Sequence, residues 1–272
     1  MMENYSIVLT VYYKEKPQFF RESILSLVNQ TRPTNDLVIV CDGPLTPELD
    51  SVIEEFTQKY DFINVVRYPE NHGSGYAAQQ GLLAAKNDIV GRMDSDDISC
   101  PDRFEKEVAK IEEGFDFIGG AIAEFEEDPN NCFSVKKTPE NIEEIIKYSK
   151  KRNPFCNVTT CYRKSKVLAV GGYIDQLYLE DYTLGIKMIQ SGAKCCNLQE
   201  VMVNVRSNMD QMARRSDKKL RKWFKKLRKY MLKTKYINWF QYVWYSFQTD
   251  VFCLSPNWLK RWFYKHLLRK RK

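Results

Sequence analysis

The amino-acid sequence predicts an α/β fold with a mostly parallel β-sheet flanked by helices and followed by a basic, amphipathic helical tail. Short apolar runs rich in β-branched residues alternate with segments of helical periodicity over the first half of the chain, and this alternation favours a parallel sheet. The last residues differ, because positions 214–272 carry 19 of the 42 Lys and Arg residues. We therefore assign residues 1–213 to an α/β domain and residues 214–272 to a tail.

The alternation can be followed element by element. Apolar runs predict strands at residues 6–12, 37–41, 63–68 and 89–93. Apolar side chains at helical spacing predict helices at 17–29, 47–60 and 76–85, as with Leu49, Val52 and Phe56 in the second of these. After a helix at 101–113 the alternation loosens. There we predict strands at 115–125, 157–162 and 201–205, a polar turn at 126–131, and helices at 141–150 and from the acidic pair at 180–181 to about residue 191.

Charge and cysteine usage narrow the class of protein. Residues 214–272 hold 19 Lys and Arg against 2 Asp and Glu, a formal charge of +17, whereas residues 1–213 hold 23 against 33, a formal charge of −10. A basic segment on an acidic body indicates an anionic partner. The eight cysteines and two histidines show no metal-ligand spacing, which disfavours a zinc site and indicates reduced thiols in the cytosol. The opening MMENYSIVLTVYY has no basic region, so we expect no secretory signal.

A cluster of acidic residues follows the fourth predicted strand. The segment IVGRMDSDDISCPDRF brings Asp94, Asp96 and Asp97 together where that strand ends. Because like charges repel, a shared cation is one reason to place them there, and Mg²⁺ or Mn²⁺ binds through one or two carboxylates plus substrate phosphates. The alternative is that these acids cap the helix that begins near Pro101 or lie on a loop. Spacing leaves both interpretations open.

Polar residues also end the neighbouring strands. Thr10 and Tyr12 close the first strand and Asp42 closes the second, and ligands of open α/β sheets bind at the carboxyl ends of strands. Asp42 is able to accept from a nucleotide base or ribose, or to form an Asx turn before Gly43. The sequence contains no Gly-x-Gly-x-x-Gly motif after the first strand and no P-loop motif. This disfavours a dinucleotide site and excludes a P-loop.

Two later groups have a structural and a functional interpretation each. Glu180 and Asp181 precede a helix, either as acids that its dipole stabilises or as a general base with a neighbour. A second group follows the last strand and either clamps a pyrophosphate, because Arg forks match phosphate oxygens, or forms a solvated surface. Its members are Arg206, Gln211, Arg214 and Arg215.

The tail combines bases with aromatic residues. Residues 218–236 place Trp223, Phe224 and Leu227 on one helical face and bases over much of the rest, as in a helix that lies in a membrane interface. Residues 236–254 are aromatic but contain Gln241 and Asp250, so we predict no spanning helix. We expect the tail to bind an anionic membrane surface. Packing of its helices on the α/β domain and nucleic-acid binding are the alternatives.

Six segments in this order resemble the family 2 glycosyltransferases with the Rossmann-like GT-A fold, above all the branch that makes amylovoran and capsular polysaccharides. They span residues 6 to about 215 and read SIVLTVYYKEKPQFFRESILSLVNQT, LVIVCDGP, ENHGSGYAAQQGL, GRMDSDDISCPDRFEKE, NPFCNVTTCYRKSKVLAVGGY and LEDYTLGIKMIQSG.

The resemblance implies roles for individual residues. Thr10, Tyr12 and Asp42 would hold the base and ribose of a nucleotide-diphosphate sugar, most often UDP-linked. Asp94-Ser95-Asp96 would be the D-x-D motif, with Asp94 near the ribose and Asp96 on Mn²⁺ or Mg²⁺. Asp181 would be the catalytic base, with Glu180 beside it in the acceptor pocket.

The resemblance also implies a reaction. The Q-x-x-R-W motif of processive members is present only as Gln211-Met212-Ala213-Arg214-Arg215, and no channel helices are predicted, which favours transfer of a single sugar. We expect an inverting, metal-dependent enzyme on the cytoplasmic face of the cell membrane, with a polyprenyl-pyrophosphate-linked acceptor and no nucleic-acid partner. The alternatives are a sugar nucleotidyltransferase and a non-enzymatic lipid- or nucleic-acid-binding module.

Overall fold

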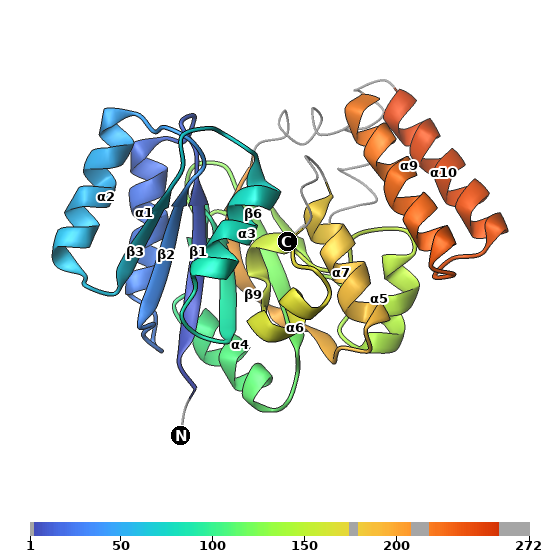
Figure 1. The fold of residues 1–272 in the computed structure, drawn as a ribbon, viewed down its shortest axis with the longest axis horizontal. Coiled ribbons are helices and arrows are strands. Elements are labelled where there is room, and N and C mark those ends of the chain that lie inside the picture. The colour runs from blue at the N-terminus through green and yellow to red at the C-terminus, as the bar shows by residue number, and fades with distance from the viewer. Residues whose placement is uncertain (1–2, 174–178, 208–217, 256–272) are drawn as a thin grey trace.

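The computed structural model describes residues 3–173, 179–207 and 218–255. Within these residues, nine strands form one twisted sheet whose order is β3-β2-β1-β4-β8-β6-β9-β5, with β7 paired to β6 (Figure 1). Parallel pairs join β1 to β2 and β4, β2 to β3, and β6 to β9. The predicted α/β class and the mostly parallel sheet are confirmed.

The first half of the chain is a regular β-α alternation, and each predicted element is present. Its bounds are β1 (Tyr5–Val11), α1 (Pro17–Val28), β2 (Asp36–Cys41), α2 (Pro47–Lys59), β3 (Ile63–Arg67), α3 (Ser74–Ala84) and β4 (Ile89–Asp94). Successive side chains of a strand point to opposite faces. Thus Ile7 and Leu9 of β1 pack with α1 and α2, whereas Val8 packs with α3 on the other face. Both faces are covered, so β1, β2 and β4 are almost entirely buried, whereas the edge strand β3 is partly exposed.

The second half closes the sheet less regularly. Its elements are β5 (Ile98–Ser99), α4 (Arg103–Glu112), β6 (Phe117–Phe125), β7 (Ser134–Lys136), α5 (Ile142–Ser149), the 3₁₀ helix η1 (Asn157–Thr159), β8 (Cys161–Arg163), α6 (Lys164–Ala169), α7 (Glu180–Gln190) and β9 (Cys195–Arg206). The short strand β8 lies antiparallel between β4 and β6 and so joins the two halves.

The structure corrects several sequence-based predictions in this half. The strand predicted at 157–162 begins as a 3₁₀ turn, because the Thr159 hydroxyl bonds back to the carbonyl oxygen of Cys156 at 2.8 Å. The strand predicted at 201–205 begins earlier, at Cys195, and its polar residues conceal the strand pattern. The elements β5, β7 and α6 were not predicted, since two- to six-residue segments give no measurable periodicity.

Close packing of α4 on the sheet depends on a glycine. A Cβ atom at Gly91 of β4 would lie 2.2 Å from the ring of Phe104 in α4, which is much closer than a carbon–carbon contact allows. Phe104 is fully buried and also stacks on Tyr5 with ring centroids 5.0 Å apart. Gly91 therefore fixes how near α4 approaches the strand that carries the acidic cluster.

The tail forms a hairpin of two helices, α9 (Lys218–Lys233) and α10 (Trp239–Leu254), at the edge of the molecule remote from α2 (Figure 1). Leu227 and Met231 of α9 pack with Tyr182 and Ile186 of α7 in a separate small core. Part of the apolar side of α9 that we expected in a membrane is therefore buried on the α/β domain, whereas Trp223 and Phe224 are only partly buried, and membrane binding by the tail stays a prediction. Because residues 208–217 lie outside the described residues, the predicted boundary at 213 stays a prediction.

Polar bonds reinforce the contact between the hairpin and the α/β domain. Gln190 at the end of α7 donates to Thr234 at 2.8 Å and accepts from the Tyr230 hydroxyl at 3.1 Å. The hydroxyls of Ser149 and Tyr236 lie 2.6 Å apart. Throughout the described residues, each helix falls short of the length and apolar character needed to cross a bilayer.

We expect Met231→Ala to lower the free energy of unfolding by about 2 kcal/mol, because it removes a side chain that is only 1% exposed from the α7–α9 core. Urea unfolding followed by tryptophan fluorescence measures the change. Lys229→Ala, at an exposed position of the same helix, is the control and should alter stability by less than about 0.5 kcal/mol. Equal midpoints for the two variants would mean that α9 does not belong to the cooperative unit.

Candidate functional site

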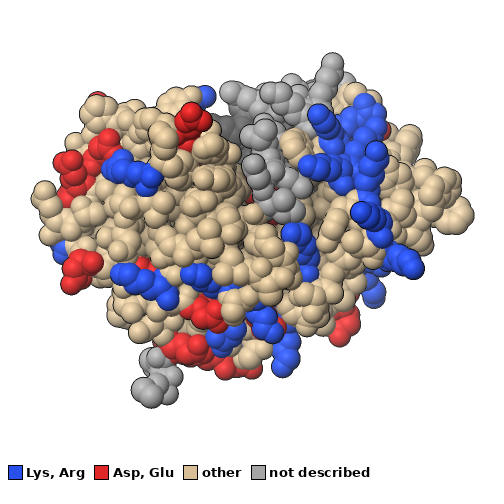
Figure 2. All heavy atoms as spheres, in the orientation of Figure 1, with Lys and Arg blue, Asp and Glu red and all other residues tan. Residues whose placement is uncertain are grey.

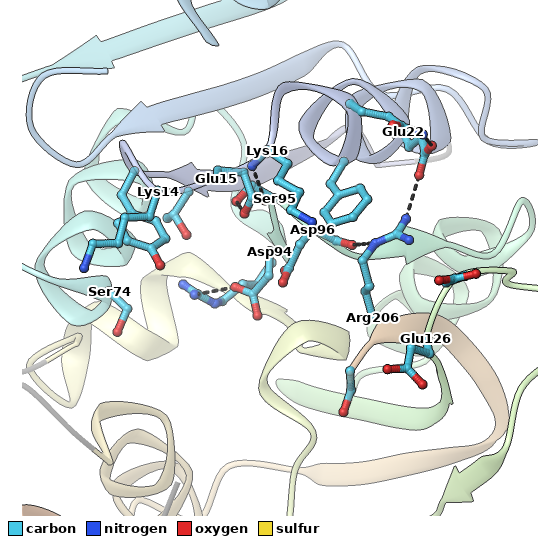
Figure 3. A pocket seen from close by; sticks show the side chains of 17 residues that line it. Lys14, Glu15, Lys16, Glu22, Ser74, Asp94, Ser95, Asp96, Glu126 and Arg206 are labelled. Carbon is cyan, nitrogen blue, oxygen red and sulfur yellow. Dashed lines mark hydrogen bonds and ion pairs between the residues drawn. The ribbon is translucent and has the colours of Figure 1, made fainter. Parts of the chain in front are cut away.

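A cavity of about 700 Å³ opens at the carboxyl ends of β1 and β4 (Figure 3). We call it the cleft. It is lined by the end of β1, the loop before α1, the turn after β4 and the end of β9. Among the sequence-predicted site residues, the cleft brings together Thr10, Tyr12, Asp94, Asp96 and Arg206.

Hydrogen bonds hold the Asp94-Ser95-Asp96 turn in one conformation. The carbonyl oxygen of Asp94 accepts from the Ser23 hydroxyl of α1 at 3.0 Å. Ser95 donates to Glu15 at 2.8 Å, as the dashed line in Figure 3 marks. Asp94 is thus fixed at the strand end with its carboxylate directed into the cleft.

Arg92, two residues before Asp94, is a cleft residue that the sequence analysis missed. Its side chain is 3% exposed, and Nη2 pairs with the Asp94 carboxylate at 2.9 Å. Its guanidinium lies 6.0 Å from the ring centroid of Tyr173. The Nε atom is buried and finds no hydrogen-bond partner among the described residues. Arg92 is therefore a buried positive charge with a free donor beside the acidic cluster.

Asp97 and Arg206 tie the two halves of the sheet together at the cleft. Asp97 is 3% exposed and accepts from the backbone N–H of Arg206 at 2.8 Å. The Arg206 side chain donates to the carbonyl oxygen of Asp96 at 3.2 Å and pairs with Glu22 at 2.6 Å. It also stacks on Phe19, 3.8 Å from the ring centroid. Of the predicted phosphate clamp, Arg206 thus lies at the cleft, but its guanidinium is already engaged, and its role as a clamp stays a prediction.

The carboxylates of the turn suit a hard divalent cation that takes most of its ligands from elsewhere. Asp94 and Asp96 line the same cleft, whereas the described residues contain no group of three or more His, Cys, Asp or Glu side chains placed to hold a metal. Mg²⁺ and Mn²⁺ bind in this way, through one or two carboxylates completed by phosphate oxygens and water. The two side chains therefore fit the predicted metal, which would need a bound diphosphate.

Asp42 has a different environment from the one that we predicted. It is 5% exposed, and its carboxylate accepts from the Tyr68 hydroxyl at 3.0 Å, the Asn71 amide at 2.9 Å, and the backbone N–H groups of His72 and Gly73 at 2.8 and 3.0 Å. Four donors leave little capacity for a nucleotide. What the structure shows is that Asp42 holds the loop that leads into α3, and its contact with a base or ribose stays a prediction.

Glu180 and Asp181 form the first turn of α7, as predicted. Asp181 is half-buried and accepts from the Asn153 amide at 2.7 Å and from the backbone N–H of Tyr182 at 2.7 Å. Burial, together with the negative charge of Glu180, raises the pKa of Asp181 to about 6. A carboxylate with this pKa accepts a proton more readily than an ordinary aspartate and is still ionised near neutral pH.

Two contacts connect this acidic pair with the cleft. Ser74, which lines the cleft, donates to the Glu180 carboxylate. The positive charge of Arg92 also interacts with both acidic groups, with Asp94 of the turn and with Glu180 of α7. The predicted base and the predicted D-x-D motif therefore belong to one electrostatic unit.

Further cleft residues were missed, and some predicted ones cannot be placed. Lys14, Glu15 and Lys16 follow β1 and point towards the cleft (Figure 3). The signal was available, because these charges directly follow a predicted strand end in YYKEKP. The predicted site residues Gln211 and Arg214, with Arg215, lie outside the described residues.

Comparison with known proteins identifies the chain's relatives. The family model Glycosyl transferase family 2 matches residues 6–171. An uncharacterized glycosyltransferase of Haemophilus influenzae is 43% identical over 78% of this chain and 79% of its own length. The amylovoran biosynthesis glycosyltransferase AmsE of Erwinia amylovora is 32% identical, with the same coverage of both chains. The UDP-Gal:alpha-D-GlcNAc-diphosphoundecaprenol beta-1,3-galactosyltransferase of Escherichia coli is 30% identical over 98% of this chain and 97% of its own.

Solved structures give the same fold. Residues 1–349 of S. aureus TarS superpose with a TM-score of 0.65 at 18% sequence identity, over 97% of this chain and 72% of that chain. The same TarS fragment in complex with UDP gives a TM-score of 0.62 over 84% of this chain and 65% of that chain. The predicted GT-A fold and the resemblance to the amylovoran and capsular branch are confirmed.

The raised pKa of Asp181 predicts that Asp181→Asn stabilises the protein at neutral pH. The folded chain binds this proton more tightly than the unfolded chain, for which the ordinary value is 3.8. Ionised Asp181 therefore costs stability above pH 6, by about 1–3 kcal/mol, and costs nothing below about pH 4. Urea unfolding of wild type and Asp181→Asn at pH 4 and pH 7.5 tests this. A difference of equal size at both pH values would contradict the raised pKa.

Proposed function

The chain belongs to glycosyl transferase family 2, and on that basis we propose that it transfers one sugar from a nucleotide-diphosphate sugar, with UDP as the nucleotide, to a hydroxyl of a lipid-pyrophosphate-linked oligosaccharide. The product would belong to a bacterial capsule, exopolysaccharide or O-antigen. The observation that carries the proposal is the cleft, in which Asp94 and Asp96 face two lysines and which Ser74 connects to the Glu180-Asp181 pair.

Two similarities support the donor and the acceptor. The relative that matches almost the whole chain has a name that specifies UDP-Gal and a diphosphoundecaprenol-linked GlcNAc. The TarS fragment with the same fold binds UDP. In this chain the lysines of the loop after β1, Lys14 and Lys16, line the same cleft as the acidic turn, and such cations suit the diphosphate of a nucleotide sugar.

The reaction that we propose is an inverting displacement. Asp181 accepts the proton of the acceptor hydroxyl while the oxygen of that hydroxyl forms a bond to the anomeric carbon of the donor sugar. The bond from the anomeric carbon to the diphosphate oxygen breaks at the same time. A divalent metal held by Asp94 and Asp96 would offset the charge on the departing diphosphate. Asn153 orients the Asp181 carboxylate, and Ser74 holds Glu180 next to it.

The proposed acceptor places the enzyme at a membrane. A polyprenyl-pyrophosphate chain resides in the bilayer, so a transferase that uses this acceptor would work at the membrane, on its cytoplasmic face. The basic hairpin α9–α10 is the part of the described chain that suits an anionic inner-membrane surface.

We expect Asp181→Asn to lower kcat by about 10²–10⁴-fold, the usual contribution of a general base, while UDP binding persists. Steady-state transfer with a lipid-linked acceptor, alongside calorimetric UDP binding, separates the two effects. For the wild type, kcat should rise with pH to an apparent pKa of about 6 and then level off, because the raised pKa belongs to the base. Asp61→Asn, an exposed acid after α2, is the control, and undiminished turnover in Asp181→Asn would disprove the assignment.

The metal and donor are tested by thermal unfolding with UDP, GDP, dTDP or CMP, each with and without Mn²⁺. At about 100 times its Kd a ligand stabilises by about 2.7 kcal/mol, which corresponds to a rise in Tm of roughly 5–10 °C for a chain of this size. We expect this rise for UDP with Mn²⁺ and its loss in Asp96→Ala, with Asp61→Ala as the control. If UDP raised the Tm equally with and without Mn²⁺, and equally in wild type and Asp96→Ala, the proposed metal site would be wrong.

A further inference from the structure

The second helix of the tail hairpin exposes a continuous apolar face. Six of its side chains, an adjacent pair followed by four residues spaced every three or four positions, keep 51–77% of their surface exposed: Trp239, Phe240, Trp244, Phe247, Val251 and Leu254. Trp244 and Phe247 stack on each other with ring centroids 6.1 Å apart. We call these six residues the α10 face. Scattered apolar side chains are ordinary on a protein surface, but an unbroken aromatic stripe marks an interaction site.

Lysines border the α10 face. Lys222, Lys225, Lys226 and Lys229 of α9 are all exposed, and Figure 2 shows blue side chains gathered over α9 next to the uncharged surface of α10. A cationic strip beside an aromatic strip is the arrangement of proteins that lie on anionic lipid, in which the rings enter the headgroup region and the bases meet lipid phosphates.

The single acidic residue of the two helices is neutralised inside the hairpin. Asp250 of α10 accepts from Arg221 of α9 at 2.5 and 2.7 Å, and Lys225 lies 4.0 Å away. These partners lower the pKa of Asp250, above all through the hydrogen bond from Arg221. The pairing also holds α9 and α10 together, so that the lysines and the aromatic face keep a fixed relation. The surface therefore presents no unpaired negative charge to an anionic partner.

The apolar side chains of the two tail helices have different environments. The apolar side of α9 is used against α7, where Leu227 and Met231 are buried. The α10 face, in contrast, points away from the α/β domain and remains exposed. A helix of 16 residues is shorter than the roughly 20 that span a bilayer, so contact with lipid would be parallel to the surface.

We propose that the α10 face is a docking surface for an anionic lipid bilayer, with the lysines of α9 as its electrostatic border. A second copy of the chain is a weaker occupant, since face-to-face packing of two such hairpins would bring their lysine borders together. The inference rests on the proposed function for the reason that the enzyme visits a membrane, but docking itself requires no substrate.

Flotation of the full chain with vesicles tests the proposal. We compare vesicles of phosphatidylcholine with vesicles that contain about 30% phosphatidylglycerol, at low and high salt. The test variant is Trp244→Gln with Phe247→Gln, two side chains that are each 58% exposed and whose replacement should leave folding intact. The matched control is Leu83→Gln with Phe133→Gln, two exposed apolar residues on the α/β domain. Tm values confirm that both variants fold.

We expect wild type and control to float with the anionic vesicles, less so at high salt, and the test variant to bind at least about 10-fold more weakly. All three should transfer sugar equally well to a water-soluble acceptor analogue without vesicles. Equal flotation of the test variant would overturn the proposal, as would sedimentation showing that the α10 face instead joins two copies in solution. Absence of transfer in every form, with flotation as expected, would instead refute the proposed function and leave the docking surface standing.

Discussion

The hydrogen bond from the Arg206 backbone to the buried Asp97 carboxylate joins two sides of the cleft that come from distant parts of the chain. It joins the end of β9 to the turn after β4, and the antiparallel pairing of β5 with β9 extends the same link. A buried carboxylate without a donor would cost about 1–3 kcal/mol or more, so the turn is held wherever β9 ends. Because Asp94 and Asp96 lie within three residues of Asp97, this contact helps to place them, together with the bonds that Ser23, Glu15 and the Arg206 side chain make with the same turn. The acid of the cluster that does not line the cleft thus contributes to positioning the other two.

Electrostatic balance is the second constraint on the site. Asp94, Glu180 and Asp181 bring negative charge to a partly buried region, and Arg92 is the buried positive charge that acts on all three. Burial would otherwise disfavour such a concentration of carboxylates. Arg92 does not compensate fully at Asp181, because burial and the charge of Glu180 still raise its pKa, and this makes the carboxylate more basic than an ordinary aspartate. The proposed base would therefore cost the folded chain some stability, as is common in enzymes.

Much of the α/β domain could be predicted from the sequence, because the signals are local. Helical periodicity predicted α1 and α2, and short apolar runs predicted the four strands β1 to β4, so the position of Asp94 and Asp96 at a strand end could be predicted as well. Contacts between distant segments could not be predicted in this way. The four donors around Asp42 come from a segment about 30 residues away. The interactions of Arg92 with Tyr173 and Glu180 also join residues that are far apart in the sequence. Likewise, the pattern of α9 showed an apolar face but not that α7 would cover it.

The packing of α9 on α7 also restricts which substitutions the protein can accept during evolution. Tyr182 and Ile186 lie one and five positions after Asp181, so the helix that carries the proposed base also carries the socket for the hairpin. A descendant that lost the hairpin would expose the apolar side chains of Tyr182 and Ile186 to solvent. It would need polar residues at these two positions to avoid an exposed apolar patch. Substitutions in α9 and α7 should therefore be inherited in matched pairs, and the hairpin is better regarded as an inherited part of the α/β domain than as an exchangeable appendage.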